Sequence, residues 1–92
     1  MIQGFDCSDT ELLYRIGRSR RWDSISNVAM RKLTQLDAAA SLDFLKSPPG
    51  NRFEALRGDR AGQFSIRIND QFRLCFTWTS KGPDHVEIVD YH

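Results

Sequence analysis

Arginine is the main cation of this sequence and the residue type with the clearest chemical potential. Ten of the thirteen Lys and Arg residues are arginines, although the formal net charge is only +1. A guanidinium presents a planar fork of N–H donors that matches phosphate oxygens, whereas a lysine ammonium acts more as a point charge. Four arginines occupy one short stretch: Arg57, Arg60, Arg67 and Arg73. This stretch predicts an anion-binding surface, provided that the fold brings the side chains together.

Proton-transfer chemistry would depend on a histidine and two carboxylates. His92 carries an imidazole, which ionises near neutrality and can act as general acid or general base. Judged alone, His92 can equally be a frayed terminal residue. Asp90 can orient that imidazole or simply end a strand. Glu54 is either a functional carboxylate or an exposed strand acid.

A metal site is not expected. Cys7, Cys75, His85 and His92 supply zinc-type donors, but no pair has the close spacing of known zinc motifs. No secretory signal is visible at the start of the sequence, so the two cysteines are expected to stay reduced. For the same reason we expect a cytoplasmic protein, and no apolar run is long enough for a membrane span.

A second basic cluster comprises Arg18, Arg20 and Arg21, followed by Trp22. These arginines can bind RNA phosphates without sequence specificity. Alternatively, they belong to a solvated loop between helices that Trp22 anchors.

The elements that must position these residues divide into a helical half and a strand-rich half. The chain has 92 residues, enough for one domain, residues 1–92. We predict a short strand at residues 2–5, then a helix with a capping box of Ser8 and Glu11 that ends near Gly17. An apolar stripe predicts a second helix at residues 24–38, and a further helical turn precedes the break at residues 47–51.

After the break, the apolar period changes to two. Residues 64–68 and 72–78 alternate, with a hairpin turn at Asn69-Asp70, and a second turn at residues 81–84 leads to a last strand. The predicted fold is therefore α+β, with two to three helices packed on one face of a small, mainly antiparallel sheet. Alternation places Arg67 and Arg73 on neighbouring strands, on the face opposite the core. Both can form a cationic patch, or they can be solvated strand charges.

The second half resembles the core of HigB-type toxins of the RelE/ParE toxin–antitoxin superfamily. The resemblance is carried by residues 56–76, from Leu56-Arg57-Gly58 to Leu74-Cys75-Phe76, and by the ending Asp90-Tyr91-His92. Residues 20–22 and 47–51 are similar to the GraT branch. The resemblance implies a RelE-like fold and ribosome-dependent cleavage of mRNA without a metal or cofactor. It also implies a HigA-like helix-turn-helix antitoxin, through which the complex would bind operator DNA.

The reaction that the resemblance implies needs three chemical roles, for which the side chains suggest candidates. Cleavage through the 2′-hydroxyl needs a general base, a cationic clamp for the phosphorane and a general acid. Arg73 would be the clamp, with Arg57 and Arg67 in support, although Arg57 can be a turn charge. His92 would be the acid, and Tyr91 would stack on a base or belong to the core.

Glu54 matches a position where some HigB toxins have histidine and where the YoeB branch has a glutamate proposed as general base. Alternation puts Glu54 on the Leu56 side, so a bulge or a strand end is needed to expose it. Arg60, Arg67, Arg18, Arg20 and Arg21 would contact RNA.

Two other functions remain open. A ParE-like relative would share the fold but poison DNA gyrase, and it would not need His92 or Glu54. A non-catalytic RNA-binding module would use the arginines for affinity alone, so loss of His92 would barely weaken it.

Overall fold

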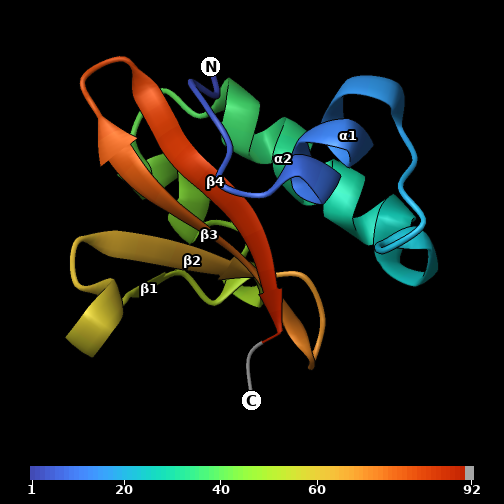
Figure 1. The fold of residues 1–92 in the computed structure, drawn as a ribbon. Coiled ribbons are helices and arrows are strands. Elements are labelled where there is room, and N and C mark those ends of the chain that lie inside the picture. Colours follow the sequence, from blue (N-terminus) through green and yellow to red (C-terminus); the bar gives the residue numbers. More distant parts are fainter. Residues whose placement is uncertain (91–92) are drawn as a thin grey trace.

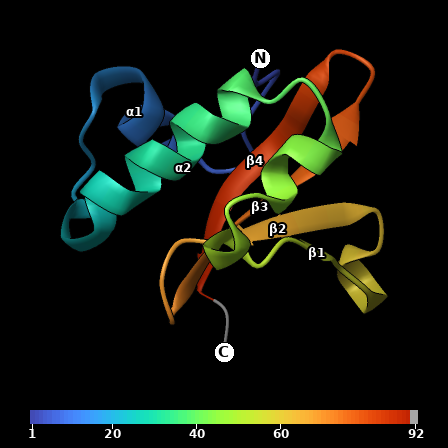
Figure 2. The same ribbon diagram turned by 180° about the vertical axis from the view of Figure 1, so that it is seen from behind.

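Two α-helices lie on one face of a four-stranded antiparallel sheet, which Figure 1 and Figure 2 show from opposite sides. The structure, a computed structural model, describes residues 1–90 of the chain. This arrangement confirms the α+β class predicted from the sequence. Among the described residues, no helix is long and apolar enough to cross a membrane.

The helices are α1, Ser8–Ile16, and α2, Ser26–Ala38. Helix α1 ends as predicted at Gly17, whose left-handed φ of 81° lets its N–H donate to the Leu13 carbonyl. The predicted capping box is wrong. Cys7 is the N-cap residue and provides no side-chain cap, and the Glu11 carboxylate instead accepts a 2.9 Å hydrogen bond from Arg15.

Short 3₁₀ segments connect the larger elements: η1, Asp23–Ile25; η2, Leu42–Lys46; η3, Pro49–Asn51; and η4, Gly58–Arg60. The predicted helical turn before the break corresponds to η2. The fully buried Asn51 holds η2 and η3 together, because its amide nitrogen donates to the Leu45 carbonyl at 3.1 Å. A buried amide satisfied in this way fixes the path of the chain between α2 and the sheet.

The strands are β1, Glu54–Ala55; β2, Gln63–Arg67; β3, Phe72–Thr79; and β4, Gly82–Asp90, in the spatial order β1-β2-β3-β4. The predicted β2–β3 hairpin is confirmed, and the Asn69 side chain accepts hydrogen bonds from the backbone of Gln71 and Phe72. The second turn is shorter than predicted. Strand β4 already begins at Gly82, so Pro83 and Asp84 belong to the sheet.

The N-terminal segment runs beside β4 but forms no strand. Phe5 makes an isolated parallel bridge with Val86, and the Gln3 N–H donates to the Pro83 carbonyl at 2.7 Å. The strand predicted at residues 2–5 is therefore reduced to a bridge. The buried Thr10 hydroxyl of α1 accepts from the Ile88 N–H, so the outer edge of β4 is covered.

The core lies between the helices and the sheet. Helices α1 and α2 contribute Leu13, Ala29, Leu33 and Leu36, and the strands contribute Ile66, Leu74, Phe76, Val86 and Ile88. Because successive strand residues point to opposite faces, the residues between these strand positions point to the other face. We call that other side the open face of the sheet.

Candidate active site on the open face of the sheet

The strand register places four side chains in one row across the open face. Cα partners in order from β1 to β4 are Glu54, Ser65, Cys75 and Glu87. Residues directly opposite one another in antiparallel strands project from the same face, and their Cβ atoms are neighbours. We call these four residues the polar row.

Arg73 lies beside the polar row and is held rigidly there. It is the register partner of Arg67, its Nε donates to the Ser65 hydroxyl at 2.8 Å, and its Nη2 donates to the Arg52 carbonyl at 2.5 Å. Arg52 has a left-handed φ of 45°, which turns the chain just before β1. The guanidinium is therefore oriented by two elements that are distant in sequence.

The exposure of Arg73 corrects the expectation from the sequence. The prediction that Arg67 and Arg73 share the face opposite the core is confirmed by their pairing. The alternative that Arg73 is a solvated charge on the strand is wrong, because only 9% of this residue is exposed. Burial follows from the hydrogen bonds to Ser65 and to the Arg52 carbonyl, which alternation within one strand cannot reveal. In a low-dielectric position, a cation interacts with an anion more strongly than in water.

The Cys75 thiol, at the centre of the polar row, is in an environment that makes it unreactive at neutral pH. Cys75 has no exposed surface, and burial raises its pKa to about 11, with the charges of Glu87 and Glu54 adding to the effect and those of Arg60 and Arg73 opposing it. A thiol in this state is a poor nucleophile at neutral pH. These charge effects also indicate that Cys75 lies in the midst of the four ionic side chains.

Arg60 reaches the polar row from η4. Its Nη1 donates to Glu87 and to Gln63, both at 3.0 Å, and Glu87 is half-buried. The ion pair ties η4 to β4 across two intervening strands. Arg60 was predicted to contact RNA, and the structure adds that its position depends on Glu87.

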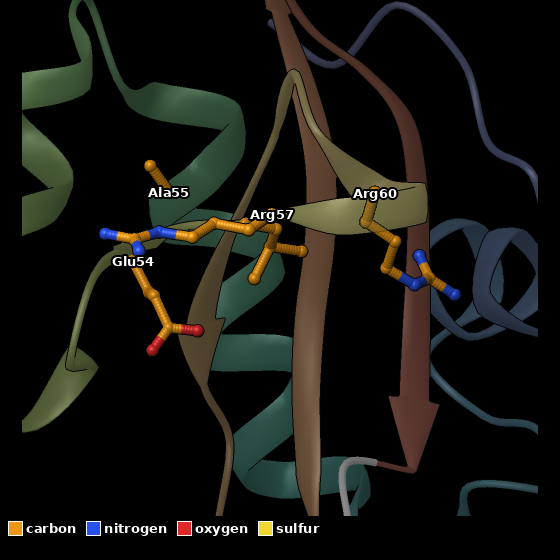
Figure 3. A pocket seen from close by; sticks show the side chains of 5 residues that line it. Glu54, Ala55, Arg57 and Arg60 are labelled. Atoms are coloured by element: carbon orange, nitrogen blue, oxygen red, sulfur yellow. The ribbon is translucent and has the colours of Figure 1, made fainter.

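A shallow pocket of about 430 Å³ opens at the β1 end of the row, lined by Glu54, Ala55, Leu56, Arg57 and Arg60. Figure 3 shows that the Arg57 side chain extends toward the Glu54 side, whereas Arg60 points across the sheet toward β4. A carboxylate and two guanidinium groups therefore border one concave surface. Such a surface suits an anionic ligand that also has protons to exchange.

The exposure of Glu54 removes a conflict that the sequence left open. Strand β1 ends at Ala55, directly after Glu54. Leu56 is buried but lies outside the main core cluster and lines the pocket. Glu54 is exposed on the same side, so the predicted strand end is present and no bulge is needed.

The ends of β2 and β4 carry two further candidates. Arg67 pairs with the exposed carboxylate of Asp70 in the hairpin loop. Asp90 is the last residue of β4 and accepts a 3.1 Å hydrogen bond from the Gln71 side chain. Tyr91 and His92, the two candidates that follow, lie outside the described residues.

The N-terminal arginines do not form one patch. Arg21 lines a hollow of about 700 Å³ together with Glu87 of the polar row and Asp90 at the end of β4. Arg21 is 4.6 Å from the centre of the Trp22 ring and pairs with Asp9 at 3.4 Å. Arg18 and Arg20 instead line a separate hollow of about 460 Å³. Trp22 is buried in the core, which matches the loop-anchoring alternative for this segment.

The side chains in residues 1–90 that could bind a metal do not form a cluster. No group of three His, Cys, Asp or Glu residues there is placed to hold a metal ion. Cys7 and Cys75 are both free thiols. Nδ1 of the exposed His85 instead forms a 2.8 Å hydrogen bond with Oδ1 of Asp6 on the N-terminal segment. This hydrogen bond, with the charges of Asp6 and Asp84, raises the pKa of the imidazole.

Ser65 and Glu87 were not singled out from the sequence, and Cys75 was considered there only as a zinc-type donor and a reduced thiol. Alternation carries a signal for each, since each is flanked by two core residues or aromatic residues on a strand. The sequence alone does not supply the register that brings them into one row.

Known proteins share both sequence and fold with this chain. Residues 11–92 match the family model described as the RelE-like toxin of type II toxin–antitoxin system HigB. Toxin HigB-1 of Vibrio cholerae serotype O1 is 54% identical over 55 residues, which are 60% of this chain and 58% of that toxin. The matched region thus spans less than two thirds of the relative's length.

Solved structures share the fold at low sequence identity. A YafQ mutant from E. coli has a TM-score of 0.69 and 17% identity, over 98% of this chain and 91% of that chain. The YoeB–YefM complex from Staphylococcus aureus gives a TM-score of 0.62 and 17% identity, over 100% of this chain and 95% of that chain. At these identities the likeness concerns the fold alone.

Proposed function

Because the chain belongs to the HigB-like family of RelE-like toxins from type II toxin–antitoxin systems, we propose that it is an endoribonuclease that cuts mRNA on the ribosome in the cytoplasm. The reaction needs no metal or cofactor in this proposal. The 2′-hydroxyl of a nucleotide attacks the adjacent phosphorus, and the 5′-oxygen of the next nucleotide leaves.

The observation that carries the proposal is the position of Arg73 next to the polar row. Its guanidinium bonds to Ser65, and Ser65 is the register partner of Glu54. A buried, oriented cation and an exposed carboxylate therefore share one neighbour. Attack by a 2′-hydroxyl needs this combination, since one group accepts the proton while the other meets the charge that develops on the phosphorane.

Arg73 is the clamp in this mechanism. Its hydrogen bonds to Ser65 and to the Arg52 carbonyl fix the guanidinium before substrate arrives. A preorganised donor stabilises developing charge without the cost of reorganising at the moment of reaction. Arg57, on the rim of the adjacent pocket, holds a second phosphate oxygen.

Glu54 is the general base and His92 the general acid. Glu54 is exposed at the pocket and takes the proton of the 2′-hydroxyl. His92 protonates the leaving 5′-oxygen, Asp90 orients its imidazole, and Tyr91 stacks on a base next to the cleaved bond. These roles of residues 90–92 rest on the chemistry of their side chains together with the family resemblance, and they are part of the proposal.

The remaining arginines bind the RNA strand by charge. Arg60 and Arg67 border the open face, and Arg18, Arg20 and Arg21 contact ribosomal RNA from the loop before η1. Phosphate contacts of this kind supply affinity that depends on salt and not on sequence.

The partner in this proposal is a HigA-like helix-turn-helix antitoxin. The YoeB–YefM complex from Staphylococcus aureus is a complex of a protein of the same fold with another protein. Operator DNA would be bound only through the antitoxin.

Primer extension on a defined mRNA, with and without programmed ribosomes, tests the proposal. Glu54→Gln, Arg73→Lys and His92→Gln are each compared with wild type. His85→Gln is the matched control for His92, because His85 is an exposed histidine that pairs with Asp6, away from the pocket. Removal of a general acid or base is expected to slow cleavage by about 100-fold or more, and the control is expected to cut normally.

Ribosome-dependent cuts that disappear in the three variants and persist in the control would support the proposed mechanism. Two results would contradict it: cleavage by His92→Gln at the wild-type rate, or no cleavage under any condition combined with inhibition of gyrase supercoiling.

A further inference from the structure

A second basic surface lies next to Arg67, between α2, η3 and the β2–β3 loop. It is a hollow of about 390 Å³ whose polar lining consists of Arg31, Lys32, Gln35 and Arg67. Seen from the helix side in Figure 2, α2 and the segment that leads from it to β1 lie over the sheet near the β2–β3 hairpin. We call this surface the basic hollow.

A buried polar network holds the central cation of the basic hollow. The Lys32 ammonium donates to the side-chain oxygen of Asn51 at 2.5 Å. Asn51 has no exposed surface, and its amide nitrogen donates in turn to the Leu45 carbonyl and to Gln35. Lys32 is thus positioned by the fold, unlike a surface lysine that moves freely in solvent.

The three cations of the basic hollow share a single carboxylate partner within residues 1–90. Burial, followed by the charges of Arg31 and Arg67, lowers the pKa of Lys32. In residues 1–90, Arg31 and Lys32 form no ion pair with a carboxylate, and the partner of Arg67 is Asp70, whose side chain is 99% exposed. Like charges gathered in this way repel one another, and a bound anion would offset that cost.

The basic hollow also continues the candidate active site. Arg67 lines it and is the register partner of Arg73, which bonds to Ser65 of the polar row. An RNA strand carries one phosphate per nucleotide, so a strand with one phosphate at Arg73 presents others nearby. Guanidinium groups match phosphate oxygens, and an amide such as Gln35 can bind a ribose or a base edge.

We propose that the basic hollow binds the phosphate backbone of single-stranded RNA, through Arg31, Lys32 and Arg67, next to the bond that is cut. This inference rests on the proposed function for the identity of the anion. The strand is either the mRNA that is cut or an unpaired segment of ribosomal RNA, and the chemistry of the interaction is the same for both.

The test measures binding and not cleavage. The probe is a short single-stranded RNA in which every 2′-hydroxyl is methylated, so that it cannot be cut through that oxygen. The double variant Arg31→Gln/Lys32→Gln removes two charges, and Gln at position 32 retains a donor for Asn51. Lys81→Gln is the control, because Lys81 is an exposed cation in the β3–β4 turn, away from the basic hollow. Thermal unfolding checks that each variant is folded.

The double variant is expected to bind the probe at least about 10-fold more weakly at low salt, and the control as wild type. The slope of log K against log salt concentration should fall by about 0.7 for each phosphate that the variant no longer binds. A second arm measures binding to vacant ribosomes. Weaker binding of the oligonucleotide with unchanged binding of vacant ribosomes identifies the mRNA strand as the ligand, and weaker binding of vacant ribosomes identifies ribosomal RNA.

Unchanged affinity for both probes would overturn the inference, as would an equal loss in the control. The outcome is independent of cleavage. A chain that cuts no RNA but binds RNA more weakly in the double variant keeps the RNA site and refutes the nuclease. If the chain cuts RNA and the double variant binds both probes as wild type does, the nuclease is supported and the RNA site at the basic hollow is refuted.

Discussion

Arg73 and Ser65 form a buried hydrogen bond that runs diagonally between β3 and β2. The Nε–Oγ distance is 2.8 Å, and Ser65 has no exposed surface. The two are not register partners, since Ser65 lies opposite Cys75 and Arg73 opposite Arg67. The bond directs the guanidinium toward β1, where the Arg52 carbonyl accepts a further hydrogen bond.

Ser65→Ala is therefore expected to destabilise the fold and to lower activity. The substitution leaves the Arg73 Nε hydrogen without its acceptor in a buried position. A buried donor that loses its partner costs about 1–3 kcal/mol of unfolding free energy. Urea denaturation of wild type and Ser65→Ala measures this cost, and the cleavage rate of the folded variant measures the effect on the clamp.

Ser80→Ala is the matched control, because Ser80 is exposed in the β3–β4 turn. It should change the unfolding free energy by less than about 0.5 kcal/mol. Equal unfolding curves for Ser65→Ala and Ser80→Ala would show that the hydrogen bond does not hold Arg73.

Arg60 and Glu87 should act as one unit in cleavage. Glu87 holds the Arg60 guanidinium at 3.0 Å, but the Arg60 side chain is 42% exposed, so the ion pair should add no more than about 1 kcal/mol to stability. We expect Glu87→Gln and Arg60→Gln to lower kcat/KM for cleavage by similar factors. The double variant should then be little worse than either single variant, because the first change has already broken the ion pair.

A double-mutant cycle in kcat/KM, with unfolding free energies measured in parallel, checks this coupling. Losses that simply multiply in the double variant would mean that the two residues act independently. A loss of stability well above that expected for a surface pair would assign Glu87 a structural role instead.

The sequence predicted correctly several elements whose patterns depend only on neighbouring residues. The apolar stripe of α2, the left-handed Gly17 at the end of α1 and the alternation in β2 and β3 each depend on neighbouring residues, and each is confirmed. The pairing of Arg67 with Arg73 could also be predicted, because a short hairpin fixes the register between its strands.

One wrong prediction was local: Arg15, four residues along α1, takes the Glu11 carboxylate that the capping box required. Others depend on residues far apart in the chain. Burial of Arg73 requires the Arg52 carbonyl, 21 residues away, and no strand pattern encodes that interaction. The start of β4 was placed too late, because Pro83 is a poor strand residue by local preference. Pro83 is nevertheless paired with Trp78, and its carbonyl accepts from Gln3.

The two thiols should differ in reactivity. Cys75 has no exposed surface and a pKa of about 11, whereas Cys7 is partly exposed at the start of α1. Iodoacetamide reacts with the thiolate, so we expect Cys7 to be alkylated first and Cys75 only on unfolding. Peptide mass spectrometry of the native and the urea-unfolded protein measures the order. Alkylation of Cys75 in the native protein at the rate of Cys7 would show that the polar row opens in solution.

The Asp6–His85 pair should make the attachment of the N-terminal segment depend on pH. Its hydrogen bond raises the pKa of His85 in the folded protein above the ordinary value. The charged imidazole is therefore favoured by folding. Its contribution is fully present below the ordinary histidine pKa and is lost as the pH rises through the raised value of the folded state. The effect is expected to be small, because both side chains are exposed and screened by solvent.

NMR titration of the His85 ring measures the shift, and His92→Gln leaves His85 as the one histidine of the 92-residue sequence. Asp6→Asn should lower the His85 pKa toward its ordinary value. Amide protection factors of Gln3 and Asp6, which bond to the Pro83 and Val86 carbonyls of β4, should fall across the same pH range in wild type and remain flat in Asp6→Asn. If the His85 pKa is the same with and without the Asp6 carboxylate, the pair does not form in solution. The attachment of the N-terminal segment would then be independent of His85, since its backbone hydrogen bonds to β4 do not titrate in this range.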